Sequence, residues 1–269
     1  MYVKNRIKLK IAAVTVIVYG MVSLTGCAGT KLLREPMQLN LQKALMTSSD
    51  DSISASLDWV VVRDGPGTWA KNADWDEYLI SVVNGTDDDI KIVDVVVVDS
   101  RGTELQTDSN RKQLVMASKQ SVKRYRDSDL KVTAGWGSAG FLPIGVGAGV
   151  VGPAVTTVCI SGAAAGTGAL LGVSAIAVDP IGAAMLAVPI SVVYGIVRAR
   201  NNSRIADEIA ARQTPLPHIL PPGGRSRLDL FFPLVPSPAQ VRVSYRQGDE
   251  PKTVNLETSE LLTGLHIVQ

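Results

Sequence analysis

The sequence predicts an α+β chain in which an antiparallel β-sandwich is interrupted by an apolar, Gly/Ala-rich helical hairpin. Short alternating strands separated by closely spaced turn signals occur in residues 56–132 and again in residues 213–269. Between them lies an apolar insert, residues 133–212, in which no charged residue occurs from Val132 to Val178. We therefore expect the two flanking regions to complete one sandwich around the insert.

The first residues have the pattern of an export signal. Four basic residues within positions 1–10 precede an apolar stretch over residues 11–22, which is too short to span a bilayer comfortably. Leu24-Thr25-Gly26-Cys27 follows, and this tetrapeptide resembles the lipobox of bacterial lipoproteins. The resemblance implies a signal peptide over residues 1–26, cleavage between Gly26 and Cys27, and acylation of Cys27 with palmitate and related lipid. An ordinary signal peptide with an incidental cysteine is the alternative.

The mature chain is weakly acidic. Cleavage removes four of the 27 basic residues and none of the 25 acidic ones, leaving a formal net charge of −2. This balance excludes a strongly basic nucleic-acid-binding face. With Cys27 lipidated, Cys159 has no cysteine partner for a disulfide. Ala28 rather than aspartate follows the cysteine, and in the lipoproteins that the sequence resembles this implies the outer membrane, here with the protein facing the periplasm.

The first half of the predicted sandwich follows a lipidated tether over residues 27–55. Residues 56–62 alternate as a strand and end at a Gly-Pro-Gly turn. Residues 78–83 and 90–98 are two further strands, and Asn84-Gly85 between them indicates a hairpin. Additional short strands are expected at residues 113–115 and 121–125.

The second half of the predicted sandwich also consists of short alternating strands separated by turns. Strands are expected at residues 228–232, 240–245 and 253–256, the second of them with apolar residues at alternate positions. The segments 78–100 and 228–233 are similar to immunoglobulin-like modules found in uncharacterised bacterial lipoproteins. That resemblance implies an immunoglobulin-like sandwich and carries no catalytic signature.

The insert contains three apolar segments, residues 141–160, 162–178 and 180–197, and the third is expected to continue as a helix to residue 212. Pairs of glycines four positions apart would align on one face of a helix, a pattern that permits close packing between helices. These pairs are Gly145 with Gly149, Gly162 with Gly166, and Gly168 with Gly172.

Two arrangements of the insert are open. Each apolar segment has about 17–20 residues, close to the length that crosses a bilayer. If both β regions lie on one side of the membrane, the insert crosses an even number of times, and two crossings with one segment lying flat is the leading interpretation. The alternative is a helical hairpin buried against the sandwich or against other copies of the chain.

No motif indicates catalysis or a cofactor. Residues 135–140 match G-x-G-x-x-G but lack a βαβ context, and the acidic run 87–89 is interpreted as a solvated turn rather than a calcium site. His218 and His266 have no ligand-spaced neighbours, so no metal site is expected. Trp59 is expected in the core and Trp136 at a membrane interface.

The sequence thus predicts a non-enzymatic envelope protein with a structural or protein-interaction role. Its expected partners are membrane lipid, through Cys27 and the insert, and a second copy or another envelope protein. A membrane-perturbing or pore-forming lipoprotein is the alternative, and an envelope hydrolase is a remote one.

Overall fold

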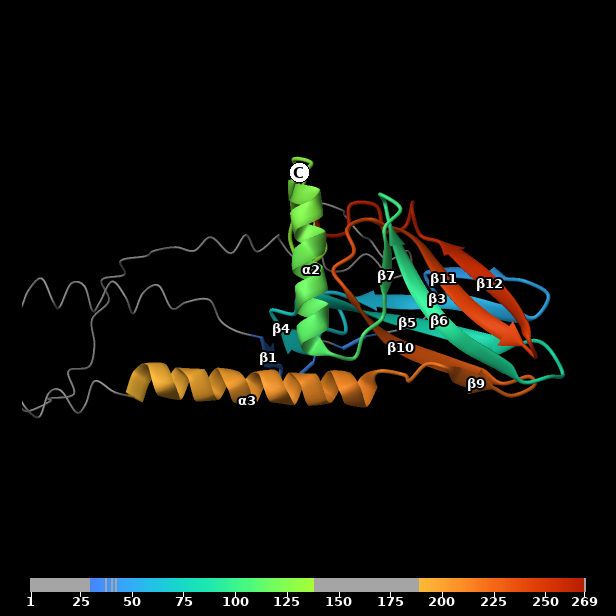
Figure 1. The fold of residues 1–269 in the computed structure, drawn as a ribbon, viewed down its shortest axis with the longest axis horizontal. Helices are drawn as coiled ribbons and strands as arrows, with labels where there is room; N and C mark the ends of the chain where they lie inside the picture. Colours follow the sequence, from blue (N-terminus) through green and yellow to red (C-terminus); the bar gives the residue numbers. More distant parts are fainter. Residues whose placement is uncertain (1–29, 37, 40, 42, 138–188, 269) are drawn as a thin grey trace, which may run out of the picture. The chain divides into compact units, whose positions relative to one another are not determined.

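A computed structural model describes residues 30–36, 38, 39, 41, 43–137 and 189–268. The chain divides into two compact units, one of residues 1–141 with 200–269 and one of residues 142–199. The architecture given below is that of the first unit (Figure 1). Antiparallel strands dominate the described residues, which contain two helices, α2 (Arg111–Arg126) and α3 (Pro189–Arg212).

Two antiparallel sheets share one core, the arrangement of a β-sandwich. The first sheet has the order β10-β5-β3-β2, from β10 (Arg225–Pro233), β5 (Trp75–Asn84), β3 (Ile53–Val61) and β2 (Met46–Ser49). The second has the order β12-β11-β6-β7, from β12 (Glu250–Glu257), β11 (Pro238–Gln247), β6 (Ile90–Asp99) and β7 (Glu104–Gln106). A further strand, β9 (His218–Leu220), pairs with the beginning of β6 beyond the end of β7.

At strand β5, both faces of the first sheet are buried. Tyr78, Ile80 and Val82 of β5 point into the core between the sheets, where they meet apolar side chains from β6 and β11. The alternate residues Trp75 and Glu77 face outward and are nevertheless almost fully buried, because α2 and α3 cover that face. The near-continuous burial of β5 follows from this double coverage.

The predicted hairpin at Asn84-Gly85 is wrong, because β5 and β6 belong to different sheets. The Asn84 side-chain amide donates to the carbonyl oxygens of Asp88, Leu220 and Pro221, and its Oδ1 accepts from the backbone N–H of Thr86. These hydrogen bonds fix a turn that carries the chain from one sheet across to the other. Asparagine in a turn predicted the reversal but not the partner of each strand.

The two short strands expected at residues 113–115 and 121–125 are also wrong, because α2 spans both. The helix buries Leu114, Ser118, Ser121 and Tyr125, at intervals of four, three and four residues. Asn110 caps it by accepting a hydrogen bond from the backbone N–H of Lys112. The two serines on the buried face hid the helical period, which an apolar stripe would have revealed.

Residues 27–55, expected as a tether, include strands from position 31 onward. β1 (Lys31–Leu32) pairs with β4 (Ala70–Lys71), and β2 pairs with β3. The sandwich therefore begins before residue 56. It takes up this part of the chain because pairing satisfies backbone groups of β4 and of the β3 edge.

The predicted insert lies largely outside the described residues. This holds for all six glycines of the predicted helix-packing stripe, as it does for Gly26 and Cys27. Its last helical part, α3, ends at Arg212 as expected. Among the helices of the described residues, none combines the length and apolar character needed to cross a membrane.

Candidate functional site: anchorage of the N-terminal segment and of the insert

Three segments of the folded unit adjoin the features that the sequence marks as functional. The N-terminal segment (residues 30–33) follows the predicted lipidation site. The entry segment (residues 131–137) leads into the insert, and the exit segment (residues 200–212, the last part of α3) leads out of it. The site is built from the contacts that hold these three segments on the sandwich.

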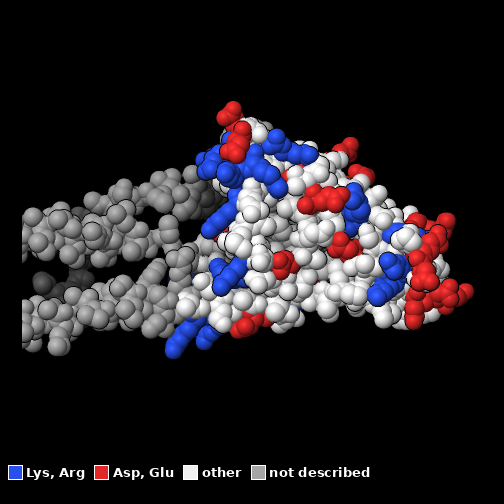
Figure 2. Space-filling model, viewed as in Figure 1, with Lys and Arg blue, Asp and Glu red and all other residues white. Residues whose placement is uncertain are grey.

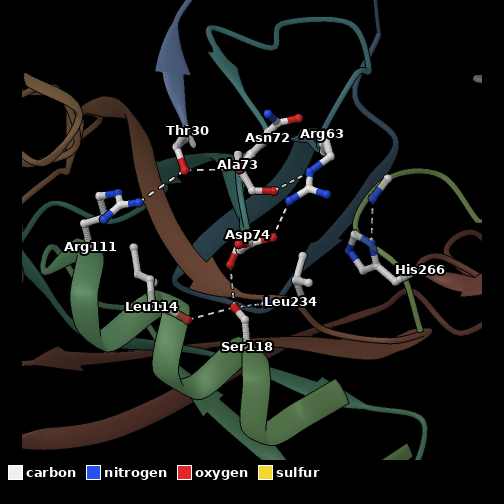
Figure 3. Close-up of polar contacts among 11 residues, drawn as sticks. Thr30, Arg63, Asn72, Ala73, Asp74, Arg111, Leu114, Ser118, Leu234 and His266 are labelled. Carbon is white, nitrogen blue, oxygen red and sulfur yellow. Dashed lines mark hydrogen bonds and ion pairs between the residues drawn. The ribbon is translucent and has the colours of Figure 1, made fainter. Parts of the chain in front are cut away.

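The N-terminal segment is bound to the folded unit from Thr30 onward. Thr30 is 7% exposed; its hydroxyl donates to the carbonyl oxygen of Asn72 at 3.3 Å and accepts from Nη2 of Arg111 at 3.2 Å (Figure 3). The backbone N–H of Leu33 donates to the carbonyl oxygen of Trp69 at 2.9 Å. Thr30 follows the predicted lipidation site, Cys27, by three residues in the sequence.

The connection between β4 and β5 joins the N-terminal segment to α2. Arg63 donates from Nε to the carbonyl oxygen of Ala73 at 2.8 Å and forms an ion pair with Asp74 (Figure 3). Oγ of Ser118, on the buried face of α2, lies 2.5 Å from the carbonyl oxygen of Asp74 and accepts from the backbone N–H of Leu234 at 2.9 Å. One serine thus connects α2 to both the β4–β5 connection and the chain that leaves β10.

The entry segment is held by the C-terminal tail. β8 (Lys131–Val132) pairs with β13 (Ile267–Val268), and the backbone N–H of Thr133 donates to the carbonyl oxygen of His266 at 2.9 Å. The backbone N–H of Gly135 then donates to Nδ1 of the His266 ring at 3.2 Å. Gly137 has a φ of +66°, and a Cβ there would lie 2.5 Å from the carbonyl oxygen of Ile267, so only glycine fits this approach.

His266 is in turn fixed by a buried carboxylate. Since Nδ1 accepts a hydrogen bond from Gly135, the ring proton resides on Nε2, which donates to Oδ2 of Asp76 at 2.7 Å. Both side chains are 0% exposed. Within the described residues, Oδ1 of Asp76 and the hydroxyl of Tyr78 have no hydrogen-bond partner, and burial together with the charge of Asp76 raises the pKa of Tyr78 well above its usual value.

This Asp–His pair does not have the geometry of an acid–base catalyst. A catalytic histidine must reach the proton that it transfers, directly or through one water molecule. The full burial of both His266 and Asp76 closes them to a substrate in this state of the protein. Their role in the structure is to hold the C-terminal tail and, through it, the entry segment.

The exit segment is held on the outer face of the first sheet. Ile205 and Ile209 are fully buried among Trp69, Trp75 and Phe231. They lie four residues apart on one face of α3, so the helix presents a short apolar stripe to the sheet.

A buried carboxylate extends this contact at the end of α3. Glu77, on the outer face of β5, accepts from Nε1 of Trp69 at 2.7 Å, and Nη1 of Arg212 lies 3.8 Å from its other oxygen. The guanidinium of Arg212 lies over the Trp69 ring, 4.9 Å from its centroid, and donates to Glu208 at 2.7 Å. Burial raises the pKa of Glu77, although the Trp69 hydrogen bond and the charge of Arg212 oppose the shift.

The other residues discussed from sequence lie apart from these contacts. The acidic turn at residues 87–89 is exposed, His218 lies within β9, and no group of three metal-ligating side chains occurs among the described residues. Trp59 is buried as predicted. The ring of Trp136 lies edge-on to it at 6.3 Å and packs, partly buried, against the sandwich.

Sequence reasoning missed the partners Asp76 and His266, which are 190 positions apart in the chain. Neither residue could be identified from a local pattern of alternating apolar and polar residues. The only available signals were a charged residue within an otherwise apolar strand and a histidine in an apolar tail.

Comparisons of the chain with known protein families, with curated proteins and with solved structures gave no match. The fold and the site define a β-sandwich unit that holds three segments in place: the N-terminal segment, the entry segment and the exit segment.

Proposed function

We propose that this chain is a lipid-anchored envelope protein with a non-catalytic, structural or protein-interaction role, in which the apolar insert self-associates or enters the membrane. The lipobox-like residues support a lipid on Cys27, and Ala28 after it supports attachment to the outer membrane, facing the periplasm. The proposal rests on the lipobox residues together with the anchorage of the segments beside the lipidation site and the insert.

The observation that carries the proposal is that the entry and exit segments are both held on one folded unit. The entry segment is fixed through His266 and Asp76, and the exit segment through Arg212 and Glu77. A chain that leaves and returns to the same unit crosses a membrane an even number of times or not at all. A hairpin with glycine-lined faces satisfies this constraint, whether it packs in the bilayer or against another copy.

Lipidation is tested first. The full chain expressed with its own leader should incorporate labelled palmitate and float with outer-membrane vesicles in a density gradient, and Cys27→Ala should abolish the labelling. Cys159→Ala is the matched control and should label as the native chain does. Equal labelling of Cys27→Ala and the native chain would remove the lipid anchor from the proposal.

The role of the insert is tested separately. With residues 1–27 replaced by a soluble secretory leader, retention in the membrane pellet at alkaline pH means that the insert enters the bilayer. Release as a folded protein means that it is buried within a fold or an oligomer.

Self-association has its own variant pair. Replacing Gly162 and Gly166 by leucine should abolish crosslinked oligomers, because two bulky side chains would separate helices that pack through that face. Ala164→Leu places one leucine on the opposite face of the predicted helix and should leave crosslinking unchanged. Persistent oligomers in the double glycine variant would refute self-association through this stripe.

A separate measurement tests the pore-forming alternative. Dye leakage from liposomes carrying the native chain would favour a pore-forming role.

A further inference from the structure

The exposed face of α2 carries charge of one sign only. The helix contains six basic residues and no acidic one. Four of the six lie on one stripe with an exposed methionine, at intervals of four and three residues that bring them to the same side of the helix. These residues are Lys112, Met116, Lys119, Lys123 and Arg126, all of them exposed, with Met116 at 50%.

The charges of this stripe are not used within the folded unit. In the part of the chain that the structure describes, none of its four basic side chains forms an ion pair, whereas the neighbouring Arg124 lies 4.0 Å from the buried Asp99. Asp127 and Asp129 follow the helix but lie beyond its last turn. The stripe therefore presents a net positive surface about 21 Å long.

Acidic side chains gather at the other end of the sandwich. There the β2–β3, β5–β6 and β11–β12 turns meet, since the backbone N–H of Gly85 donates to the carbonyl oxygen of Ser52, and the Ser52 hydroxyl donates to Gln247. Figure 2 shows basic residues grouped where α2 lies and acidic residues grouped at the opposite end. The acidic residues of these turns are Asp50, Asp51, Asp87, Asp88, Asp89 and Asp249, and Glu250 follows at the start of β12.

The helix that carries the basic stripe begins at a residue bound to the N-terminal segment. Arg111, in the first turn of α2, donates to Thr30, and Thr30 is three residues from Cys27. A lipid on Cys27 would therefore hold α2 close to the membrane surface. Its exposed lysines would face phosphate groups there, while the acidic end would be repelled.

We propose that the Lys112–Arg126 face of α2 lies on the anionic phospholipid surface of the membrane and sets the orientation of the sandwich. This inference rests on the lipid anchor proposed above. Each lysine or arginine close to an anionic bilayer raises binding by about fivefold, so four of them are enough to fix the orientation of a protein that is already tethered. An acidic protein partner would also match the charge, but the proximity of the lipid attachment point favours the membrane.

The test uses the full lipidated chain in vesicles and measures how fast a charged maleimide alkylates a reporter cysteine. Cys159→Ser removes the native thiol, and Met116→Cys places the reporter in the middle of the stripe. We expect alkylation to be at least tenfold slower in phosphatidylglycerol-containing vesicles than in pure phosphatidylcholine vesicles, and the difference to vanish at about 1 M salt. As a control, Thr86→Cys places the reporter cysteine in the exposed β5–β6 turn. This cysteine should be alkylated equally fast in the two kinds of vesicle.

Two sets of charge-reversing substitutions distinguish an effect of the basic stripe from an effect of the protein's net charge. Lys112→Glu, Lys119→Glu and Lys123→Glu together should remove the protection of residue 116. Lys91→Glu, Arg225→Glu and Arg246→Glu change the net charge equally at exposed positions away from α2 and should leave the protection intact.

The outcomes that overturn the inference are distinct. Equal alkylation in both vesicle types, with the protein still floating with the vesicles, refutes the α2 surface and leaves the lipid anchor standing. Failure of the native chain to float refutes the anchor and the inference with it. Equal protection of residue 116 in detergent without vesicles assigns the face to a second copy of the chain and also overturns the inference.

Discussion

The Nε2 atom of His266 lies 2.7 Å from Oδ2 of Asp76, and neither side chain is exposed to solvent. A hydrogen bond to a buried carboxylate has a large effect when it is removed, because the charge left behind has neither solvent nor partner. In this protein the same imidazole also accepts from the backbone of Gly135. One side chain thereby couples the stability of the sandwich to the position of the entry segment.

His266→Ala is therefore expected to lower the free energy of unfolding by about 3 kcal/mol or more. Asp76→Asn should cost less, because an amide oxygen still accepts from Nε2 and no charge remains buried. Chemical denaturation of the full chain in detergent measures both variants. If His266→Ala unfolded at the same denaturant concentration as the native protein, the pair would not stabilise the fold.

Gly137 and Gly102 form a matched pair for the entry segment. Both have positive φ, +66° and +77°, but a Cβ at Gly137 would meet the backbone of Gly264 and Ile267, whereas nothing lies within 4 Å of one at Gly102. Gly102→Ala should cost about 1–2 kcal/mol, from the left-handed backbone alone. Gly137→Ala adds steric overlap with atoms that cannot move without breaking the β8–β13 pairing, and should cost about 2–4 kcal/mol.

Limited proteolysis reports the same difference locally. Trypsin should cleave at the exposed Lys131 faster in Gly137→Ala than in the native chain, while Gly102→Ala should leave that cleavage rate unchanged. Equal cleavage rates for the two variants would show that the close approach of Gly137 does not hold the entry segment.

The strands of the sandwich were predictable because their side chains alternate. Val241, Val243 and Tyr245 are all buried, and Arg242 and Ser244 between them are not, as the sequence of β11 indicates. Apolar residues at every second position indicate a strand with one buried face, and this pattern can be read from a short stretch of sequence.

Strand pairing and the anchorage contacts were less predictable because they depend on residues far apart. Asn84 predicted a turn, but whether the chain then returned within one sheet or crossed to the other depended on Leu220 and Pro221, to which the Asn84 amide is bound. The helix α2 was missed because Ser118 and Ser121 occupy its buried face in place of apolar side chains. Ser118 binds the carbonyl oxygen of Asp74 outside the helix, and Ser121 accepts from Arg124 of α2 itself.

Arg212 is predicted to fix the end of α3. Arg212→Ala removes the cation nearest the buried Glu77 and the guanidinium over the Trp69 ring, and should lower the free energy of unfolding by about 1–3 kcal/mol. Hydrogen–deuterium exchange of residues 205–212 should be faster as well. Arg204→Ala is the matched control: Arg204 is exposed and forms no ion pair in the described part of the chain, so its removal should cost less than about 0.5 kcal/mol. Similar exchange rates in the two variants would refute the assignment.

Glu77 predicts a specific pH dependence. Because burial raises its pKa above the usual value of 4.5, the folded protein holds this proton more tightly than the unfolded chain does. The contribution of Glu77 to stability is therefore greatest below about pH 4.5 and is lost as the pH rises through the raised pKa. Asp50 has the opposite effect: burial acts to raise its pKa, but hydrogen bonds from Tyr245 and the backbone lower it overall.

The free energies of unfolding of the native chain and of Glu77→Gln, measured by chemical denaturation between about pH 4 and pH 7, isolate this effect. Other carboxylates contribute equally to both proteins and cancel in the difference. The native chain should lose stability relative to Glu77→Gln as the pH rises, because only the native chain must ionise a carboxyl group enclosed by Trp69 and α3. Asp50→Asn serves as the control of opposite sign, and the native chain should gain stability relative to it over the acidic part of the range. A difference between native and Glu77→Gln that is flat, or that grows in favour of the native chain with pH, would show that Arg212 and Trp69 compensate fully for the burial of Glu77.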